Sequence, residues 1–382
     1  MMEGYKIALL LGLFFYVISS SAQHVSVDCM MVYKEGGAPA VFNSPNCPQW
    51  VFPAKSSQNH LEKCQFATLQ GRRKYQEDRM TCNPAMKIPF LGSEGWVDVE
   101  VSVAGMFDGH LGKEASELAS KKFLEYLSLH VVFINYERAS HQKPSSVESS
   151  GSIAPTDDIS FYAILKEALW KTFENIDTEF CQKALRAGYN SGTTGTVALL
   201  VNGKLLVGYV GDSKAVLYSR EVHDDEGNLE GSCAEELTRD HHPDREDERA
   251  RIEASGGFVR LVDVHRVIGM MALSRSIGDI HMKSYGVIAE PEMIGWRNLT
   301  SKNSYLVIAS DGIFESLTIT NICHILHETS APDDVPEMFT SAASTPTSST
   351  LAELIVHAAY DMGSNDNLSA IVIPLESLTS ST

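Results

Sequence analysis

The feature that most constrains this chain is a set of acidic positions at the ends of apolar, strand-like runs. Each has a glycine or another small residue nearby, and glycine lets the backbone bend sharply and approach a ligand closely. A single Asp-Gly or Gly-Asp pair is an ordinary turn. Their recurrence in one chain instead predicts strands that end at a shared, carboxylate-rich site. The positions are Glu77-Asp78, Asp108, Asp212, Asp279, Asp311 and Asp366.

Carboxylates gathered in this way repel one another unless protons or cations neutralise them. Hard oxygen ligands favour Mg²⁺ or Mn²⁺, and the sequence contains no Cys or Cys/His set with zinc spacing. Two such ions about 3.5–4 Å apart can grip a phosphate and bridge a hydroxide. The pattern therefore predicts a metal-dependent phosphate-ester hydrolase.

The apolar patterns predict an α+β fold with stacked antiparallel sheets flanked by helices, because strands occur in runs without regular βαβ alternation. The sharpest signal is a hairpin, 196–201 and 204–210, around the Asn202-Gly203 turn. Residues 214–218 are expected to continue its sheet. The other expected strands are 97–103, 305–309 and 368–374, and the expected helices are 113–128, 160–186, 243–255 and 351–360.

Composition excludes some classes of protein. The chain has 382 residues, 43% hydrophobic and 21% charged, which is typical of a globular protein and not of a disordered one. Its 49 acidic and 31 basic residues give a net charge of -18. A chain with this charge lacks the excess of basic residues typical of a nucleic-acid-binding protein, so we expect no nucleic-acid partner.

The N-terminus predicts entry into the secretory pathway. Lys6 precedes an uncharged apolar run, 7–18, and small residues follow at 19–22. This is typical of a signal peptide over 1–22; the alternative is an uncleaved signal anchor. We therefore expect membrane association through residues 7–22 and a secretory or membrane-anchored location, with a cytosolic location as the alternative.

The remaining chain divides into three expected parts. Residues 23–58, rich in Gly and Pro, are expected to form an irregular N-terminal extension. A catalytic domain is expected over 59–376, followed by a tail, 377–382. Ser/Thr/Pro-rich stretches at about 139–157 and 330–350 are expected to be surface insertions.

Cysteines and glycosylation sequons bear on the compartment. Four of the seven cysteines lie within residues 29–82, so disulfides are possible there if the chain is secreted, although none is demanded. Sequons occur at Asn298 and Asn367. A glycan at Asn367, beside Asp366, would disrupt the site. Either Asn367 is too buried for modification, or the domain faces the cytosol behind a signal anchor.

Several segments, in this order, resemble the metal-dependent protein serine/threonine phosphatases of the PP2C type, plant members in particular. The resemblance covers about residues 60–376. It implies a four-layer α-β-β-α sandwich, phosphorylated protein substrates and a monomer. The segments are 71–79 (GRRKYQEDR), 107–112 (FDGHLG), 191–196 with 211–214 (SGTTGT and GDSK), 266–279 (RVIGMMALSRSIGD), and 310–314 with 363–367 (SDGIF and GSNDN).

The resemblance also implies roles for the acidic positions. Two core ions, Mg²⁺ or Mn²⁺, would share Asp108 as a bridging ligand. Glu77 and the Gly109 carbonyl would bind one ion, and Asp311 and Asp366 would bind the other. A weaker third ion would use Asp212 and Asp279, with Asp311 shared.

Three further residues would carry the chemistry. Arg73 would clamp the phosphate, with Arg72 a solvated neighbour; Asp78 would orient the attacking water; and His110 would protonate the leaving oxygen. The bridging hydroxide would attack phosphorus in line, so no phosphoenzyme would form.

The chain departs from the family pattern at Leu111, where Gly is usual, and at Glu315, where Asp is usual. Residues 258–265 lack the Trp of the plant members that act as abscisic-acid co-receptors, so we do not expect that role. Two alternatives remain: a weak or inactive scaffold protein, and a hydrolase of small phosphate esters.

Overall fold

The computed structural model describes residues 25–50, 63–92, 95–141, 159–219, 233–328 and 350–375. The strands are β1 (Gln65–Leu69), β2 (Arg79–Gly92), β3 (Gly95–Phe107), β4 (Gly109–His110), β5 (Gly192–Thr193), β6 (Gly195–Val201), β7 (Lys204–Val210), β8 (Lys214–Ser219), β9 (Ala234–Glu236), β10 (Val259–Leu261), β11 (His265–Val267), β12 (Ile277–Gly278), β13 (Glu292–Asn298), β14 (Asn303–Ala309) and β15 (Leu368–Pro374). The helices are α2 (Val27–Asn43), α3 (Glu114–His141), α4 (Ile159–Ala187), α5 (Glu246–Ala254), α6 (Ile280–Lys283), α7 (Asp311–Phe314), α8 (Ile319–Glu328) and α9 (Leu351–Asp361).

The chain forms two compact units. The first contains the described residues of 1–54, 87–100 and 124–175, and the second contains those of 55–86, 101–123 and 176–382. Each of the residues predicted to form the site belongs to the second unit.

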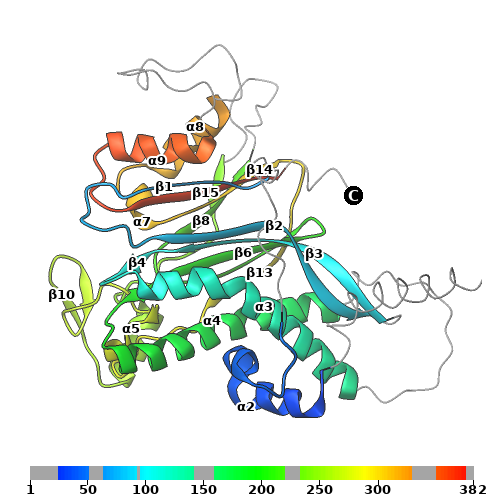
Figure 1. The fold of residues 1–382 in the computed structure, drawn as a ribbon. Coiled ribbons are helices and arrows are strands. Elements are labelled where there is room, and N and C mark those ends of the chain that lie inside the picture. The colour runs from blue at the N-terminus through cyan, green and yellow to red at the C-terminus, as the bar shows by residue number, and fades with distance from the viewer. Residues whose placement is uncertain are drawn as a thin grey trace, which may run out of the picture. The chain divides into compact units, whose positions relative to one another are not determined.

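Two antiparallel five-stranded sheets, in the orders β1-β15-β14-β8-β9 and β13-β7-β6-β3-β2, form most of the second unit; residues 87–92 of β2 and 95–100 of β3 belong to the first unit. Helices α8 and α9 lie along the outer face of the first sheet (Figure 1). On the second sheet, Phe123 of α3 packs against Phe107 of β3 with ring centroids 5.6 Å apart. The order helix, sheet, sheet, helix confirms the expected α+β sandwich.

Alternating side chains of each strand serve two different cores. In β8, Ala215 and Leu217 pack between the two sheets, whereas Val216 and Tyr218 face the helices α8 and α9. The same alternation occurs in β14 and β15. Because successive strand residues point to opposite faces, a strand buried on both faces is apolar along its whole length. This explains the unbroken apolar runs in the sequence.

The expectation that residues 214–218 continue the sheet of the hairpin is wrong. The hairpin β6–β7 forms as predicted, but β8 pairs with β14 in the other sheet. Gly211, with φ of +97°, turns the chain between the sheets, and its amide donates to Nδ1 of His241. A short turn between two strands therefore does not guarantee that they pair.

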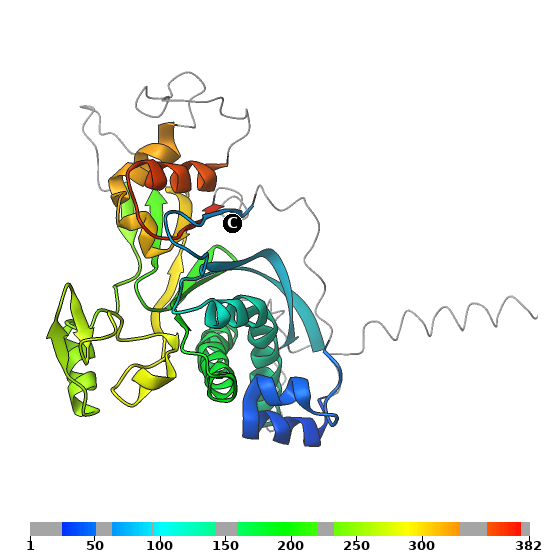
Figure 2. The same cartoon turned by 60° about the vertical axis from the view of Figure 1, so that its left-hand side comes forward.

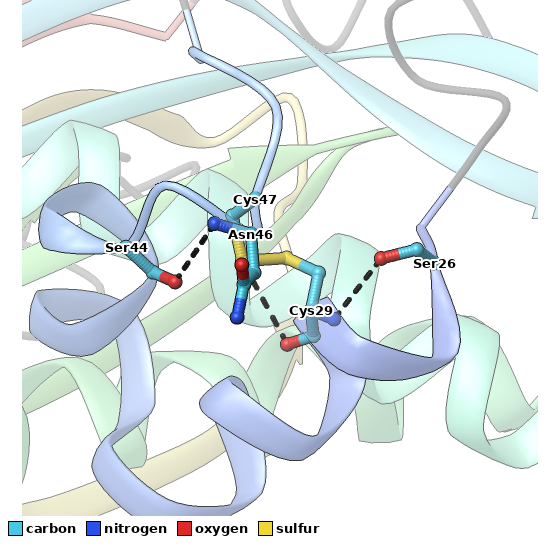
Figure 3. Close-up of a disulfide and its surroundings, with 5 residues drawn as sticks. All are labelled: Ser26, Cys29, Ser44, Asn46 and Cys47. Carbon is cyan, nitrogen blue, oxygen red and sulfur yellow. Dashed lines mark hydrogen bonds between the residues drawn. A yellow bond between two sulfur atoms is a disulfide. The ribbon is translucent and has the colours of Figure 1, made fainter.

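The expected irregular extension, 23–58, contains a helix instead. The helix α2 begins where the Ser26 hydroxyl accepts from the Cys29 amide (Figure 3). Gly37, with φ of +63°, kinks the helix. The amide of Ala38 donates to Oδ1 of Asn175 in α4, and a disulfide joins Cys29 to Cys47. The Gly-Gly-Ala-Pro sequence that indicates a loop thus forms a kink, held by tertiary contacts and a covalent link.

Aromatic packing orders α2 within the first unit. Tyr33 is buried, stacks on Phe133 at 4.3 Å and forms a hydrogen bond between its hydroxyl and Nδ1 of His130, 2.7 Å away. Burial lowers the pKa of His130 to about 3. The ring is therefore neutral at physiological pH, and its hydrogen bond to Tyr33 is one between two uncharged groups.

Other expectations fall outside the described residues or were incomplete. Residues 1–22 and 377–382, and most of 139–157 and 330–350, are outside them. Sequence patterns did not reveal β2, which contains two prolines, or α8. Among the described helices, none is long and apolar enough to cross a membrane.

The disulfide Cys64–Cys82 joins the residue before β1 to β2 and closes a loop of sequence separation 18. We predict that the double substitution Cys64→Ser with Cys82→Ser lowers the free energy of unfolding by about 3 kcal/mol, because the unfolded chain regains loop entropy. Urea unfolding of the full oxidised chain measures this. Cys181→Ser, at the free cysteine, is the matched control and should leave the midpoint unchanged. An equal midpoint for the double variant would contradict the prediction.

Candidate active site

The strand register gathers the acidic residues at one rim of the second unit. Ala309 of β14 pairs with both Ala370 of β15 and Lys214 of β8. Asp311 and Asp212 each lie two residues from this row, and Asp366 lies just before β15. Since the three strands are neighbours, three positions far apart in the sequence meet at the same edge of the sheet.

The second sheet contributes Asp108, directly after β3. The Asp108 amide donates to the Thr194 hydroxyl at 3.0 Å, and its carbonyl accepts from the amide of Thr194 and the hydroxyl of Thr193. Thr194 in turn bonds Ser213, next to Asp212. The SGTTGT segment therefore positions Asp108 against the other sheet. The sequence showed this segment as part of the family resemblance but gave it no role.

Asn367 is a positioning residue that sequence analysis missed. Its Nδ2 donates to the carbonyls of Gln70 and Tyr75, and its Oδ1 accepts from the amide of Glu77, all at 2.8–2.9 Å. These three bonds hold the loop that carries Arg73 and Glu77. The only signal in the sequence was the position of Asn367, next to Asp366.

Two glycines permit close backbone approach within the site. A Cβ at Gly71, which has φ of +63°, would lie 2.0 Å from the Asp366 carbonyl oxygen. A Cβ at Gly109 would lie 2.6 Å from the carbonyl oxygen of Glu77. Gly109 and Glu77, predicted to serve the same ion, are therefore neighbours.

Burial and neighbouring negative charges disfavour the ionised forms of several carboxylates in the site. Both carboxylate oxygens of Asp78 are buried and have no hydrogen-bond partner among the described residues. Burial raises the pKa of Asp78 to about 6 and, together with the charges of Asp212 and Asp366, raises the pKa of Asp311 to about 8. Burial, with the charges of Asp78 and Asp311, raises the pKa of Asp108 well above its usual value. Such a set fits divalent cations, which would neutralise it.

Asp108 and Asp311 open into one cavity of about 810 Å³. Predicted ligands line it together with Arg73, His110 and the apolar side chains of Leu111, Met270 and Leu273. The lining from 266 to 273 follows the β10–β11 ribbon, which projects beside the two sheets with α5 (Figure 2). The cavity is therefore lined by both acidic and apolar side chains.

Glu315 remains close to the core carboxylates despite its extra methylene. Oxygens of Asp311, Glu315 and Asp366 lie within 4.8 Å of one another. Arg73 pairs with Asp366 and holds its guanidinium at the edge of this group. The change from the Asp usual in the family thus leaves a carboxylate within reach of the same place.

His110 is paired and oriented. Its Nε2 lies 2.8 Å from Oδ2 of Asp279, which also accepts from the Ser276 hydroxyl. Burial lowers the pKa of His110, but the charge and hydrogen bond of Asp279 more than offset this, so the pKa is raised overall. The next residue, Leu111, has φ of +55° and an exposed side chain. The left-handed conformation that favours Gly is therefore adopted by Leu without displacing His110 from Asp279.

The remaining predicted residues divide between the cavity and the surrounding structure. Asp212 lines the cavity and lies 3.7 Å from Nε2 of His242. Arg72 is exposed, as expected of a solvated charge, but its guanidinium also donates to the carbonyls of Ser364 and Tyr360 and lies over the Tyr360 ring. Arg72 thus fastens the Arg73 loop to the segment before Asp366.

Comparison with known proteins agrees with this geometry. Residues 62–368 match the family model described as protein phosphatase 2C. The chain is 37% identical to the probable protein phosphatase 2C 51 of Arabidopsis thaliana, over 95% of this chain and 81% of that protein. It is 36% identical to the putative protein phosphatase 2C 76 of Oryza sativa subsp. japonica, over 93% and 86%. The chain therefore belongs to the protein phosphatase 2C family.

Solved structures agree on the fold. The crystal structure of a serine-threonine phosphatase 2C from Toxoplasma gondii matches with a TM-score of 0.61 and 22% identity, over 81% of this chain and 94% of that one. At this identity the likeness concerns the fold alone.

The raised carboxyl pKa values predict that the metal-free protein loses stability as pH rises. In the unfolded chain these groups titrate near pH 4. In the folded chain the pKa of Asp311 is raised to about 8, so Asp311 keeps its proton to a higher pH. The native state therefore binds more protons between these values, and the slope of stability against pH is negative. In EDTA we expect Tm to fall by on the order of 5 °C from pH 5 to 8.

Differential scanning fluorimetry measures this pH dependence. Asp311→Asn should flatten the profile, and millimolar Mg²⁺ or Mn²⁺ should raise Tm most at pH 8. Asp361→Asn, at an exposed aspartate of α9, is the matched control and should keep the wild-type slope. A metal-free Tm that rose from pH 5 to 8 equally in wild type and Asp311→Asn would contradict the prediction.

Proposed function

We propose that this protein removes phosphate from phosphoserine and phosphothreonine residues of proteins, using divalent cations and forming no phosphoenzyme. One observation carries the proposal: acidic side chains from both sheets, among them Asp108, Asp212 and Asp311, line one cavity together with Arg73 and His110. Membership of the protein phosphatase 2C family supports the same substrate class. We also propose that it acts as a monomer, since one unit of one chain supplies the whole set of residues.

The cation ligands proposed are those that the fold brings together. Asp108 would serve both core ions, Glu77 and the Gly109 carbonyl would serve one, and Asp311 and Asp366 would serve the other. Bound Mg²⁺ or Mn²⁺ would neutralise the phosphate and lower the pKa of a water molecule. A weaker third ion would use Asp212 and Asp279, and the pairing of Asp279 with His110 would compete with it.

Arg73 is proposed to orient the phosphate. Its side chain is largely exposed at the cavity and pairs with Asp366, so the guanidinium is held beside the proposed cation ligands. A planar guanidinium can donate to two phosphate oxygens at once. The apolar wall of Leu111, Met270 and Leu273 offers contacts to residues that flank a phosphorylated side chain, which favours a protein substrate over a small ester.

Asp78 and His110 are proposed to handle protons. Asp78, buried behind Asp108, would orient the attacking water through its unpaired oxygens. His110, held by Asp279, would donate a proton to the leaving serine or threonine oxygen.

Direct attack by water fits the cysteines of the second unit. Cys82 is in a disulfide, and burial raises the pKa of Cys181 to about 12. A thiol with that pKa is a poor nucleophile at neutral pH. Neither cysteine is therefore a good candidate to form a phosphoenzyme.

Asp108→Asn tests the proposal with little change of shape. We predict that turnover of a phosphothreonine peptide by the full chain requires Mg²⁺ or Mn²⁺ and stops in EDTA. We expect the variant to lower kcat/KM at least about 10³-fold, because a bridging ligand contributes several kcal/mol to transition-state stabilisation. Asp361→Asn should retain full activity. Phosphate release measured by a colorimetric assay provides kcat/KM.

The outcome also separates the alternatives. Absence of turnover by folded, metal-loaded protein would favour the inactive scaffold; Leu111→Gly and Glu315→Asp would then be tested for restored activity. A kcat/KM far higher for small phosphate esters than for phosphopeptides would favour the small-ester hydrolase.

His110→Gln tests proton donation separately from binding. Phosphothreonine leaves as an alkoxide and needs a proton, whereas the 4-nitrophenolate ion leaves without one. We predict that kcat falls roughly 10²–10⁴-fold for the phosphothreonine peptide and less than about tenfold for 4-nitrophenyl phosphate. His357→Gln, at an exposed histidine of α9, is the control. Equal losses on both substrates would show that His110 does not donate the proton.

A further inference from the structure

The cysteine pairing bears on the compartment in which this protein folds. Disulfides join Cys29 to Cys47 in the first unit, and Cys64 to Cys82 and Cys233 to Cys323 in the second. Among the described cysteines only Cys181 is free. Figure 3 shows the first disulfide closing the chain after α2 back onto its first turn. Reducing compartments keep such pairs open, whereas the secretory pathway forms and preserves them.

The two sequons have opposite environments. Asn298 is exposed at the end of β13, which is the edge strand of its sheet, and Thr300 is exposed as well. The backbone there is held by the pairing of Asn298 with Lys204 and by the Leu299 amide, which donates to the Gly203 carbonyl. These bonds use main-chain atoms and leave the side-chain amide nitrogen of Asn298 available to a glycan.

Asn367 cannot carry a glycan in the folded protein. It is 5% exposed, and both hydrogens of its Nδ2 are used, one to the Gln70 carbonyl and one to the Tyr75 carbonyl. A glycan would replace one of these hydrogens and would have to occupy the space of the loop that carries Arg73 and Glu77. The folded structure is therefore compatible with modification at Asn298 and incompatible with modification at Asn367.

A glycan on Asn298 would not obstruct the cavity. Asn298 pairs with Lys204 at one end of β7, and Asp212 follows the other end of the same strand. Six residue steps along a strand span about 20 Å. Modification and catalysis are thus compatible.

We propose that the phosphatase domain lies on the lumenal or extracellular side of the secretory pathway, with its disulfides formed, an N-linked glycan on Asn298 and an unmodified Asn367. The apolar run of residues 7–18 with small residues at 19–22 supplies the signal that such a location requires. The burial of Asn367 removes the conflict between a sequon at the active site and a secretory location. Substrates would then be phosphoproteins of the same compartment.

The full chain, produced in cultured human cells, provides the test. Treatment with a peptide N-glycosidase should increase the mobility of the protein in gels by the amount that the loss of one glycan causes. Mass spectrometry of the treated protein should find the deamidated asparagine at position 298. This mobility shift should be absent in Asn298→Gln and in Thr300→Ala. It should remain in Ser301→Ala, an exposed neighbour outside the sequon. Labelling with a thiol reagent under denaturing conditions should modify one cysteine before reduction and seven after it.

Several outcomes would overturn the proposal. One is an unglycosylated full chain in cells that glycosylate a secreted reporter; another is degradation of the domain by protease added to intact microsomes, which would place it in the cytosol behind a signal anchor. A glycan on Asn367 in soluble, active protein would overturn the burial argument. Asn298→Gln should keep its phosphatase activity within about twofold, so loss of the glycan and failure of the proposed catalysis are measured independently.

Discussion

Burying several carboxylates side by side costs free energy, and the second unit bears this cost at the rim where its two sheets end. Glu248, in the same unit, shows a buried carboxylate that the fold satisfies: it accepts from Arg251, Arg275 and Ser274, and its pKa is lowered far below the usual value. Asp78 has no such partners, and its pKa is raised. The difference separates an acidic residue with a structural role from a set of acidic residues whose charge the protein leaves uncompensated, as expected of a cation site.

The sandwich supplies the rigidity that such a set requires. Asp108 is anchored to Thr193 and Thr194, whereas Asp311 and Asp366 flank strands whose residues are buried on both faces. Their separation therefore follows from strand register and sheet packing more than from side-chain flexibility. The loop that carries Arg73 has no such support from strands, and Arg72 and Asn367 attach it to the segments around Asp366. The fold thus uses the sheets to position the carboxylates and side-chain hydrogen bonds to position the loop that carries Arg73.

Sequence patterns predicted this architecture where the physical signal was local. The hairpin around Asn202-Gly203, the buried strands and the long helix 159–187 were evident because turn chemistry and apolar period are properties of short segments. The assignment of β8 to the other sheet depends on Gly211 and on pairing with β14, which lies about 90 residues away. The helix α2 depends on contacts with α3 and α4 that outweigh its Gly and Pro content. Such contacts between residues far apart in the chain cannot be read from any short window of sequence.

The site residues were accessible to sequence reasoning for a different reason. Asp108, Asp311 and Asp366 mark strand ends, and a recurring pattern of this kind constrains function even before the strands are ordered in space. Asn367 was missed as a positioning residue because its three hydrogen bonds go to backbone atoms of residues 70–77, which no side-chain motif records. Its burial has a second consequence, because a residue that organises the loop carrying Arg73 and Glu77 is thereby withheld from glycosylation. The interactions that build the active site also make it compatible with a secretory compartment.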